Sequence, residues 1–254
     1  MAEQVGKYKL LALDLDGTLL NDRSEISETN AEWIGRAVAA GITVCVSTGR
    51  GFVSALPYAE QLKLDTPMIT VNGGEIWTKK PAMPHEIHRR APMDADKIVK
   101  MLDIATRRDV WYWAYTTERM FNTESWPEEP QAHQWLKFGY HSEDYALLGR
   151  IREELRGMGG LEISNSADFN IEINAAGISK GEALRNICDL LGYDISEAVH
   201  VGDSLNDIAA IREAGLGVAM GNAQDAVKQA ANVVTAHHND DGVAQVIRQY
   251  LLQG

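Results

Sequence analysis

The sequence is poor in cysteine and in long apolar runs. Only Cys45 and Cys188 occur among 254 residues, and they show neither metal-binding nor redox spacing. We therefore expect both to be small core residues. No stretch approaches the roughly 18–20 uninterrupted apolar residues of a membrane span. The first residues also lack the apolar segment of a signal peptide, so we expect a cytoplasmic protein.

Positive charge is also scarce, because 24 Lys and Arg stand against 36 Asp and Glu, which gives a formal net charge of −12. A long nucleic-acid contact surface needs a basic face, so neither a nucleic acid polymer nor an anionic membrane is expected as a partner. A small anionic substrate is not excluded, since a local cation can dominate a local site. The glycine-rich dinucleotide and P-loop motifs are absent, which disfavours those nucleotide-binding functions.

Apolar runs alternate with helical patterns at both ends of the chain. Buried strands are expected in "KLLALDLD", "ITVCVSTGR" and "PMITVNGG". The helices between them are "ISETNAEWIGRAVAAG", capped by Ser27, and "GFVSALPYAEQLKL", with Pro57 near a kink or the helix start. The same alternation resumes after residue 176. This pattern predicts an α/β fold with a doubly wound, parallel, Rossmann-like sheet.

The pattern changes near residues 80–86, "KPAMPHE". From there to residue 176 we expect helices at 94–108 and 143–157, and strands at 110–122, 161–166 and 169–174, after a strand-like "EIHRRA". These elements predict a core domain of residues 1–82 and 177–254, with an inserted α+β domain at 83–176. Five tryptophans lie in or beside the insert. We expect them to form its core, and stacking on a sugar or heterocycle is the alternative: Trp77, Trp111, Trp113, Trp126 and Trp135.

Polar residues follow each expected core strand. Ligands of open parallel sheets bind beyond the carboxyl ends of the strands, so we expect these residues to converge on one crevice. Carboxylates this close repel one another unless a cation joins them, and oxygen ligands suit Mg²⁺ bound beside a phosphate. The set comprises Asp14, Asp16, Thr18, Ser47, Thr48, Gly49, Arg50, Asn72, Gly73, Gly74, Asp203, Ser204, Asn206 and Asp207, with Lys180 at a helix start.

A calcium-binding EF-hand loop is another interpretation of "DLDGTLLND". Such a loop also begins D-x-D, and Glu25 falls at the twelfth position counted from Asp14. However, Leu19 occupies the sixth position, where the turn of the calcium loop demands glycine. We therefore disfavour an EF-hand.

Four segments in order, "DLDGT", "STGR", "SKGEAL" and "GDSLND", resemble the four motifs of the haloacid dehalogenase (HAD) superfamily of phosphotransferases. The insert stands between the second and third motifs, which is similar to the type-IIB capped, Cof-type phosphatases. "VNGG" and "DDGVAQVI" are also similar to that group. The resemblance covers the whole chain and implies a Rossmann-like core with an inserted α+β cap domain.

The resemblance implies a role for each matching residue. Asp14 would be the nucleophile that forms an aspartyl-phosphate, and Asp16 would be the general acid and then the base that activates water. Lys180 would offset charge on the nucleophile and the phosphoryl group. Thr48 would hydrogen-bond a phosphoryl oxygen. The wider substrate-binding set would be Thr48, Gly49, Arg50, Asn72, Gly73 and Asn206.

The implied cofactor is Mg²⁺, held by Asp14, the backbone carbonyl of Asp16, and Asp203. Asp207 would be a ligand through water or an anchor for Lys180. The implied function is a Mg²⁺-dependent phosphatase of a small phosphorylated metabolite, such as a sugar phosphate, a nucleotide or a phosphorylated cofactor. A phosphomutase of the phosphomannomutase type and a non-catalytic metabolite-binding protein stay open. Asp16 weighs against dehalogenation, because halide leaves without protonation.

Overall fold

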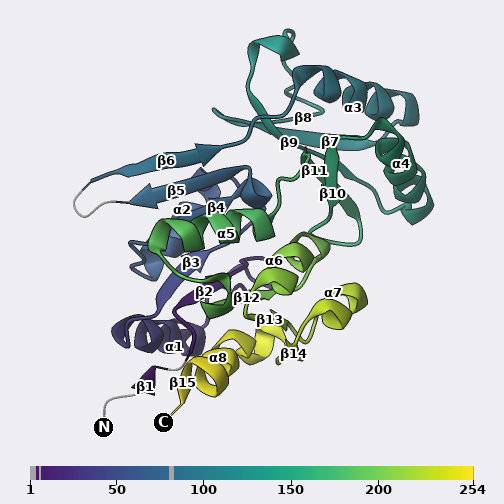
Figure 1. The fold of residues 1–254 in the computed structure, drawn as a ribbon. Helices are drawn as coiled ribbons and strands as arrows, with labels where there is room; N and C mark the ends of the chain where they lie inside the picture. Colours follow the sequence, from purple (N-terminus) through teal and green to yellow (C-terminus); the bar gives the residue numbers. More distant parts are fainter. Residues whose placement is uncertain (1–3, 6, 80–82, 254) are drawn as a thin grey trace.

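The computed structural model describes residues 4–5, 7–79 and 83–253, and its lower part is built on a parallel sheet (Figure 1). The five strands run in the order β14–β13–β12–β2–β3, and all are parallel. Successive strands move outward in opposite directions from the central β2–β12 pair, so the predicted doubly wound α/β fold is confirmed. The strands are β2 (Leu10–Leu13), β3 (Thr43–Val46), β12 (Ala198–Gly202), β13 (Leu216–Ala219) and β14 (Val233–Val234).

Helices pack on both faces of this sheet because its strands alternate their apolar side chains. Leu11 and Leu13 share one core cluster with α1 and α2, whereas Leu10 and Ala12 share another with α5. The two free cysteines are buried in this second cluster, as predicted. The core helices are α1 (Glu28–Ala39), α2 (Phe52–Gln61), α5 (Lys180–Leu191), α6 (Ile208–Glu213), α7 (Asp225–Ala230) and α8 (Gly242–Val246).

Short elements complete the core. Ser27 caps α1 by accepting from the backbone N–H of Asn30, as predicted, whereas Pro57 lies inside α2 rather than at its start. The first and last strands pair with each other, antiparallel. The remaining short elements are β1 (Gln4–Val5), η1 (Val71–Gly73), η3 (Ile195–Glu197), η4 (Leu205–Asp207), η5 (His238–Asp240), η6 (Ile247–Leu251) and β15 (Leu252–Gln253).

A three-stranded antiparallel sheet stands beside the parallel one. It consists of β4 (Met68–Thr70), β5 (Glu75–Lys79) and β6 (His85–Arg90). The expected third parallel strand, β4, meets the parallel sheet at the single parallel bridge between Ser47 and Ile69. The predicted domain boundary at residue 82 lies outside the described residues. Because β6 pairs with β5, we propose residue 91 as the start of the inserted domain, which we call the cap (residues 91–176).

The cap is an antiparallel sheet covered by two helices, α3 (Ala95–Arg108) and α4 (Tyr145–Met158), which lie close to their predicted bounds. The expected strand at 110–122 is a hairpin of two strands, and sequence analysis missed β9. This strand is buried over six of its seven residues at the centre of the sheet, so it lacks polar alternation. The order β10–β11–β9–β7–β8 joins β7 (Trp111–Thr116), β8 (Met120–Asn122), β9 (Trp135–His141), β10 (Leu161–Ser164) and β11 (Asn170–Ala175), with the short helix η2 (Pro130–Ala132) before β9.

The two faces of the cap sheet differ in chemistry. One face packs Phe138 and Ile171 against α3 and α4, whereas the other faces the core domain (Figure 1). Trp126 and Trp135 stack in the cap core with ring centroids 5.0 Å apart, as expected for core residues. Trp113 is instead half-buried and lines a cavity at the junction with the core domain.

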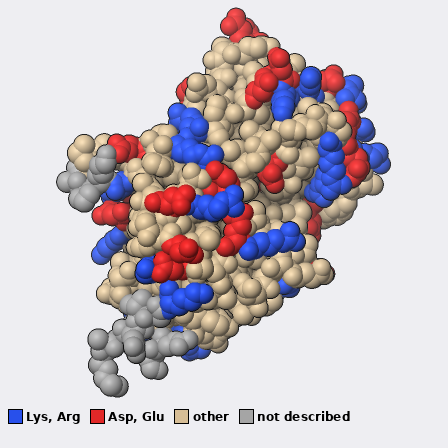
Figure 2. Space-filling model, in the orientation of Figure 1, with Lys and Arg blue, Asp and Glu red and all other residues tan. Residues whose placement is uncertain are grey.

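Acidic and basic side chains are intermixed on the face of the molecule that Figure 2 draws. Many of these charges are paired across elements. Arg107 and Arg108, near the end of α3, both contact Glu154 on α4, with N–O distances of 2.6 and 2.7 Å. Within the part of the chain that the structure describes, no helix has the length and apolar character that a membrane crossing requires.

Candidate active site

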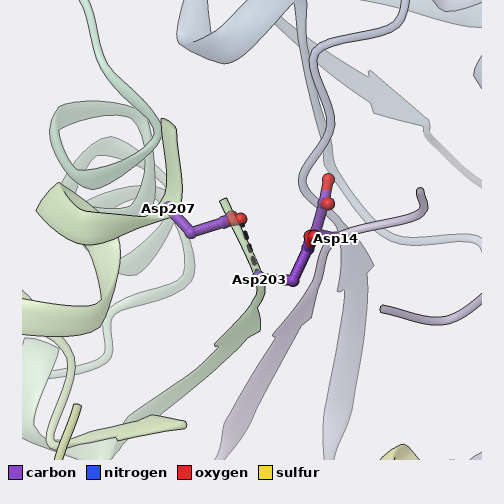
Figure 3. A group of neighbouring side chains, drawn as sticks. All are labelled: Asp14, Asp203 and Asp207. Carbon is purple, nitrogen blue, oxygen red and sulfur yellow. Dashed lines mark hydrogen bonds between the residues drawn. The ribbon is translucent and has the colours of Figure 1, made fainter. Parts of the chain in front are cut away.

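Three carboxylates meet at the carboxyl ends of the two central strands (Figure 3). Asp14 follows β2, and Asp203 and Asp207 follow β12, which pairs with β2 in parallel. Each residue offers one oxygen atom that lies within 4.8 Å of the others. The sequence-based expectation that these residues converge is therefore met, because parallel pairing places both strand ends at one edge of the sheet.

Lys180 connects two of these carboxylates from the first position of α5. Its Nζ donates to Oδ1 of Asp14 at 2.7 Å and to Oδ1 of Asp207 at 2.8 Å. The lysine is fully buried. Burial alone would lower the pKa of Lys180, but the two carboxylates outweigh it and raise the pKa, which keeps the ammonium charged.

Asp207 uses both carboxylate oxygens within the protein. Besides Lys180, Oδ1 contacts Nε2 of His200 at 2.9 Å, and Oδ2 accepts from the backbone N–H groups of Asp203 and Ser204. Burial would raise the pKa of Asp207, but Lys180 and His200 hold it below its usual range. With its oxygens so engaged, Asp207 is better placed to anchor Lys180 than to bind a metal directly. Sequence analysis missed His200, although a histidine inside the apolar strand "AVHVG" is itself a signal.

Asp14 and Asp203 are less well compensated than Asp207. Burial raises the pKa of Asp14 well above its usual value, even against the opposing effect of Lys180. Burial and the charge of Asp207 raise the pKa of Asp203 to about 7. Thr18 and Ser204 donate to Asp203 at 3.3 and 3.0 Å, and these neutral hydroxyls supply no positive charge. Two crowded carboxylates with raised pKa values are a donor set that suits a divalent cation with oxygen ligands.

Gly17 permits the close approach of the two halves of this site. Its φ of +72° is in the left-handed region, which glycine adopts without strain. A Cβ atom at this position would lie 2.5 Å from Oδ2 of Asp203. A residue larger than glycine at position 17 would therefore displace the Asp203 carboxylate.

Asp16 lies near Asp14 but its side chain is turned toward Arg50. The guanidinium binds it through two contacts, Nη2 to Oδ1 at 2.5 Å and Nε to Oδ2 at 2.8 Å. Arg50 also donates to the Tyr58 hydroxyl at 3.3 Å. The Asp16 side chain is 51% exposed, whereas Asp14 is buried. Both aspartates line one cavity with Arg50.

The loop after β3 forms another wall of this cavity, whereas Asn72, after β4, does not line it but bonds to two residues that do. Thr48 is buried, and its Oγ1 accepts from the backbone N–H of Arg50 at 3.1 Å. Asn72 donates to Oε2 of Glu172 at 2.6 Å and accepts from Asn206 at 3.1 Å. Gly73 does not line the cavity. It packs under α5 instead, where a Cβ atom would lie 2.4 Å from the backbone oxygen of Ser179.

Half of the cavity wall comes from the cap, and sequence analysis did not predict which cap residues form it. Lys137 is buried and donates to the backbone oxygen of Gly49 at 2.7 Å and to Oε1 of Glu172 at 3.0 Å. The alternating polar residues of "NIEINA", residues 170–175, were a usable signal for a polar strand face. The cavity measures about 190 Å³ and is lined by Asp14, Asp16, Thr48, Gly49, Arg50, Trp113, Tyr115, Lys137, Ser166, Asn170, Glu172 and Asn206.

Comparison with known proteins identifies the family. The model of the haloacid dehalogenase-like hydrolases matches residues 11–151 and 131–247. A 5-amino-6-(5-phospho-D-ribitylamino)uracil phosphatase of Bacillus subtilis, YcsE, is 44% identical over 244 residues, which span 96% of each chain. The pyridoxal phosphate phosphatase YbhA of Escherichia coli is 29% identical over 277 residues, spanning 96% of this chain and 99% of that protein.

Solved structures agree with this result. A haloacid dehalogenase-like hydrolase from B. subtilis superimposes with a TM-score of 0.86 at 26% identity, covering 96% of this chain and 100% of the other. A subclass IIB sugar phosphatase shares the fold, with a TM-score of 0.82 at 21% identity over 94% and 97% of the two chains. The chain belongs to the haloacid dehalogenase-like hydrolases, with a type-IIB cap. Within that family it is a phosphatase, a hydrolase of phosphoric monoesters.

Proposed function

We propose that the protein is a Mg²⁺-dependent phosphatase that hydrolyses a small phosphorylated metabolite through an aspartyl-phosphate on Asp14. The observation that carries this proposal is the buried contact of Lys180 with both Asp14 and Asp207, at 2.7 and 2.8 Å. Lys180 keeps one oxygen of Asp14 in place beside the cavity. A fixed carboxylate next to a substrate cavity is suited to nucleophilic attack when a bound cation keeps it ionised.

Asp14 and Asp203, together with the backbone carbonyl of Asp16, would hold the metal ion. Their raised pKa values without a cation support this assignment, since bound Mg²⁺ would favour the ionised carboxylates. When bound, Mg²⁺ would supply positive charge to the phosphoryl oxygens. Asp207 would act as the anchor of Lys180, because its own oxygens already accept bonds from the protein.

The chain's own residues account for both chemical steps. In the first, a carboxylate oxygen of Asp14 attacks phosphorus, the bond to the leaving oxygen breaks, and Asp16 gives that oxygen a proton. In the second, Asp16 takes a proton from water, the water oxygen attacks phosphorus, and the bond to Asp14 breaks. Asp16 must separate from Arg50 to reach the leaving group, which its half-exposed position permits.

Phosphate release from defined esters tests the proposal. The substrates named for the relatives, 5-amino-6-(5-phospho-D-ribitylamino)uracil and pyridoxal phosphate, begin the panel. We expect turnover with Mg²⁺, loss of turnover in EDTA, and loss in Asp14→Asn. The matched control is Asp65→Asn, an exposed carboxylate paired with Lys79 outside the cavity, which should retain activity.

The same assay separates the two alternatives that the sequence left open. Formation of an isomeric phosphate ester, without release of inorganic phosphate, would favour a phosphomutase. Failure to turn over any phosphoester with Mg²⁺ would contradict an enzymatic function and favour a metabolite-binding protein. Activity that survives Asp14→Asn would refute the assignment of the nucleophile.

A further inference from the structure

The cap presents two aromatic rings, those of Trp113 and Tyr115, to the cavity that Asp14 also lines. The Lys137 ammonium lies over the Tyr115 ring, 5.1 Å from the ring centroid. A Cβ atom at Gly51 would lie 3.0 Å from the same tyrosine ring, so Tyr115 also packs against the start of α2. Trp113 lines the cavity beside Asp14, and its Nε1 donates no hydrogen bond to any residue that the structure describes.

Gly139 seats the Trp113 indole flat against the cap sheet. Trp113 on β7 is in register with Gly139 on β9, and Gly139 is in register with Glu172 on β11. A Cβ atom at residue 139 would lie 2.4 to 2.6 Å from three carbon atoms of the indole. Because Gly139 has no side chain, the indole of Trp113 fills this space, and one face of its ring lies on the backbone.

Asn206, which also lines this cavity, carries a buried hydrogen-bond acceptor. Asn206 Nδ2 donates to Oδ1 of Asn72, and Asn72 Nδ2 donates to Glu172. Because this chain of donors ends on a carboxylate, it fixes the orientation of both amides. Oδ1 of Asn206 is left buried and without a partner in the described parts of the chain. Buried acceptors are rarely left unpaired, so this oxygen indicates a donor on a bound ligand.

We infer that Trp113 determines substrate specificity by stacking on a flat heteroaromatic ring in the leaving group of the phosphoester. Asn206 Oδ1 accepts an N–H or O–H of the same leaving group. This inference rests on the proposed phosphatase function and adds to it a substrate class: phosphate esters that carry a planar, hydrogen-bonding ring. Aromatic rings stack on such heterocycles independently of their exact substitution, which would allow more than one ring-bearing substrate.

A matched pair of esters tests the role of Trp113. 5-Amino-6-(5-phospho-D-ribitylamino)uracil and D-ribitol 5-phosphate share the ribityl phosphate but differ in the ring. We expect the wild type to have the higher kcat/KM for the ring-bearing ester. Trp113→Ala should lower that value by about tenfold or more, mainly through KM, and change the value for ribitol 5-phosphate less than about threefold. Trp113→Phe should retain most of the preference.

Two further variants separate stacking from a merely structural effect. Tyr145→Ala is the control, because Tyr145 on α4 is an exposed aromatic residue of the cap that does not line the cavity. It should leave the preference unchanged. Gly139→Ala should displace the indole and reduce the preference, but should have no further effect in the Trp113→Ala background.

Three outcomes would overturn the inference: a wild type without preference for the ring-bearing ester, equal losses on both esters in Trp113→Ala, or the same effect from Tyr145→Ala. In each case phosphate release by the wild type would leave the proposed function standing. Absence of phosphate release from every ester would instead contradict the proposed function itself.

Discussion

Asp14 and Asp16 lie two residues apart in "DLDGT", yet their surroundings suit different tasks. Asp14 is buried and fixed by Lys180, so its carboxylate cannot turn away from the site. Asp16 is half exposed and is bound by Arg50. Both residues line the cavity, so a bound substrate could take the place of Arg50 as the partner of Asp16. A nucleophile benefits from a fixed position, whereas an acid that serves first the leaving group and then water must be free to move between them.

Asp16→Asn should separate the two chemical steps when p-nitrophenyl phosphate is the substrate. Nitrophenolate leaves without protonation, so the first step should persist, whereas water activation should slow by about 10²- to 10⁴-fold. We expect a burst of about one nitrophenolate per site followed by slow turnover, measured by stopped-flow absorbance. Asp14→Asn should show no burst. Steady turnover at the wild-type rate in Asp16→Asn would mean that another group performs the proton transfers.

Strands β9 and β11 give the cap its polar face, and their pairing explains what the sequence could and could not predict. The core site was predictable, because Asp14 and Asp203 end apolar runs and parallel strands bring such ends together. Lys137 and Glu172, 35 residues apart, become one buried pair only through a strand that shows no alternation. Strand ends can be predicted from local patterns, whereas cross-strand partners depend on register.

Lys137→Met should destabilise the protein because it leaves Glu172 buried without its cation. We expect the free energy of unfolding to fall by about 3–5 kcal/mol, and to recover in part when Glu172→Gln is added. Arg107→Met is the control, since its ion pairs with Asp103 and Glu154 lie at the surface and should change the free energy of unfolding far less. Urea unfolding measures all three. Equal destabilisation by the single and double variants would contradict this account.

The whole molecule places the carboxylates of the candidate site between two domains that are joined by hydrogen bonds. Asn174 of the cap donates to the backbone oxygen of Val71, and Ser204 of the core donates to that of Ser166. These contacts join the cap to the core domain, and Ser166 also lines the cavity. A buried group of carboxylates makes the stability of the entire fold depend on pH and on cations.

Without metal, the contribution of Asp203 to the stability of the fold should fall as the pH rises from about 4 to about 7. The pKa of Asp203 is raised from 3.8 to about 7, so over this range the folded protein binds more protons than the unfolded chain. Mg²⁺ competes with those protons. We expect millimolar Mg²⁺ to raise the Tm more at about pH 8 than at about pH 5.5, as measured by thermal unfolding against EDTA.

Asp203→Asn should weaken this dependence, because it removes the carboxylate with the raised pKa. An equal Tm increase at both pH values, or a larger increase in acid, would show that the carboxylates do not govern the link between metal and stability.

The central position of β12 has a consequence for how the protein is made. This strand lies between β2 and β13, yet it follows the whole cap in the chain. While the chain is synthesised from its N-terminus, β2 keeps an open apolar edge until residues 198–202 emerge, and such an edge invites incorrect pairing. The contact between Lys180 and Asp14, 166 residues apart, likewise forms only after the whole cap has been synthesised. A molecule whose sheet is incomplete has no catalytic centre. The enzymatic activity of a nascent or refolding population therefore measures only the molecules in which the sheet is complete.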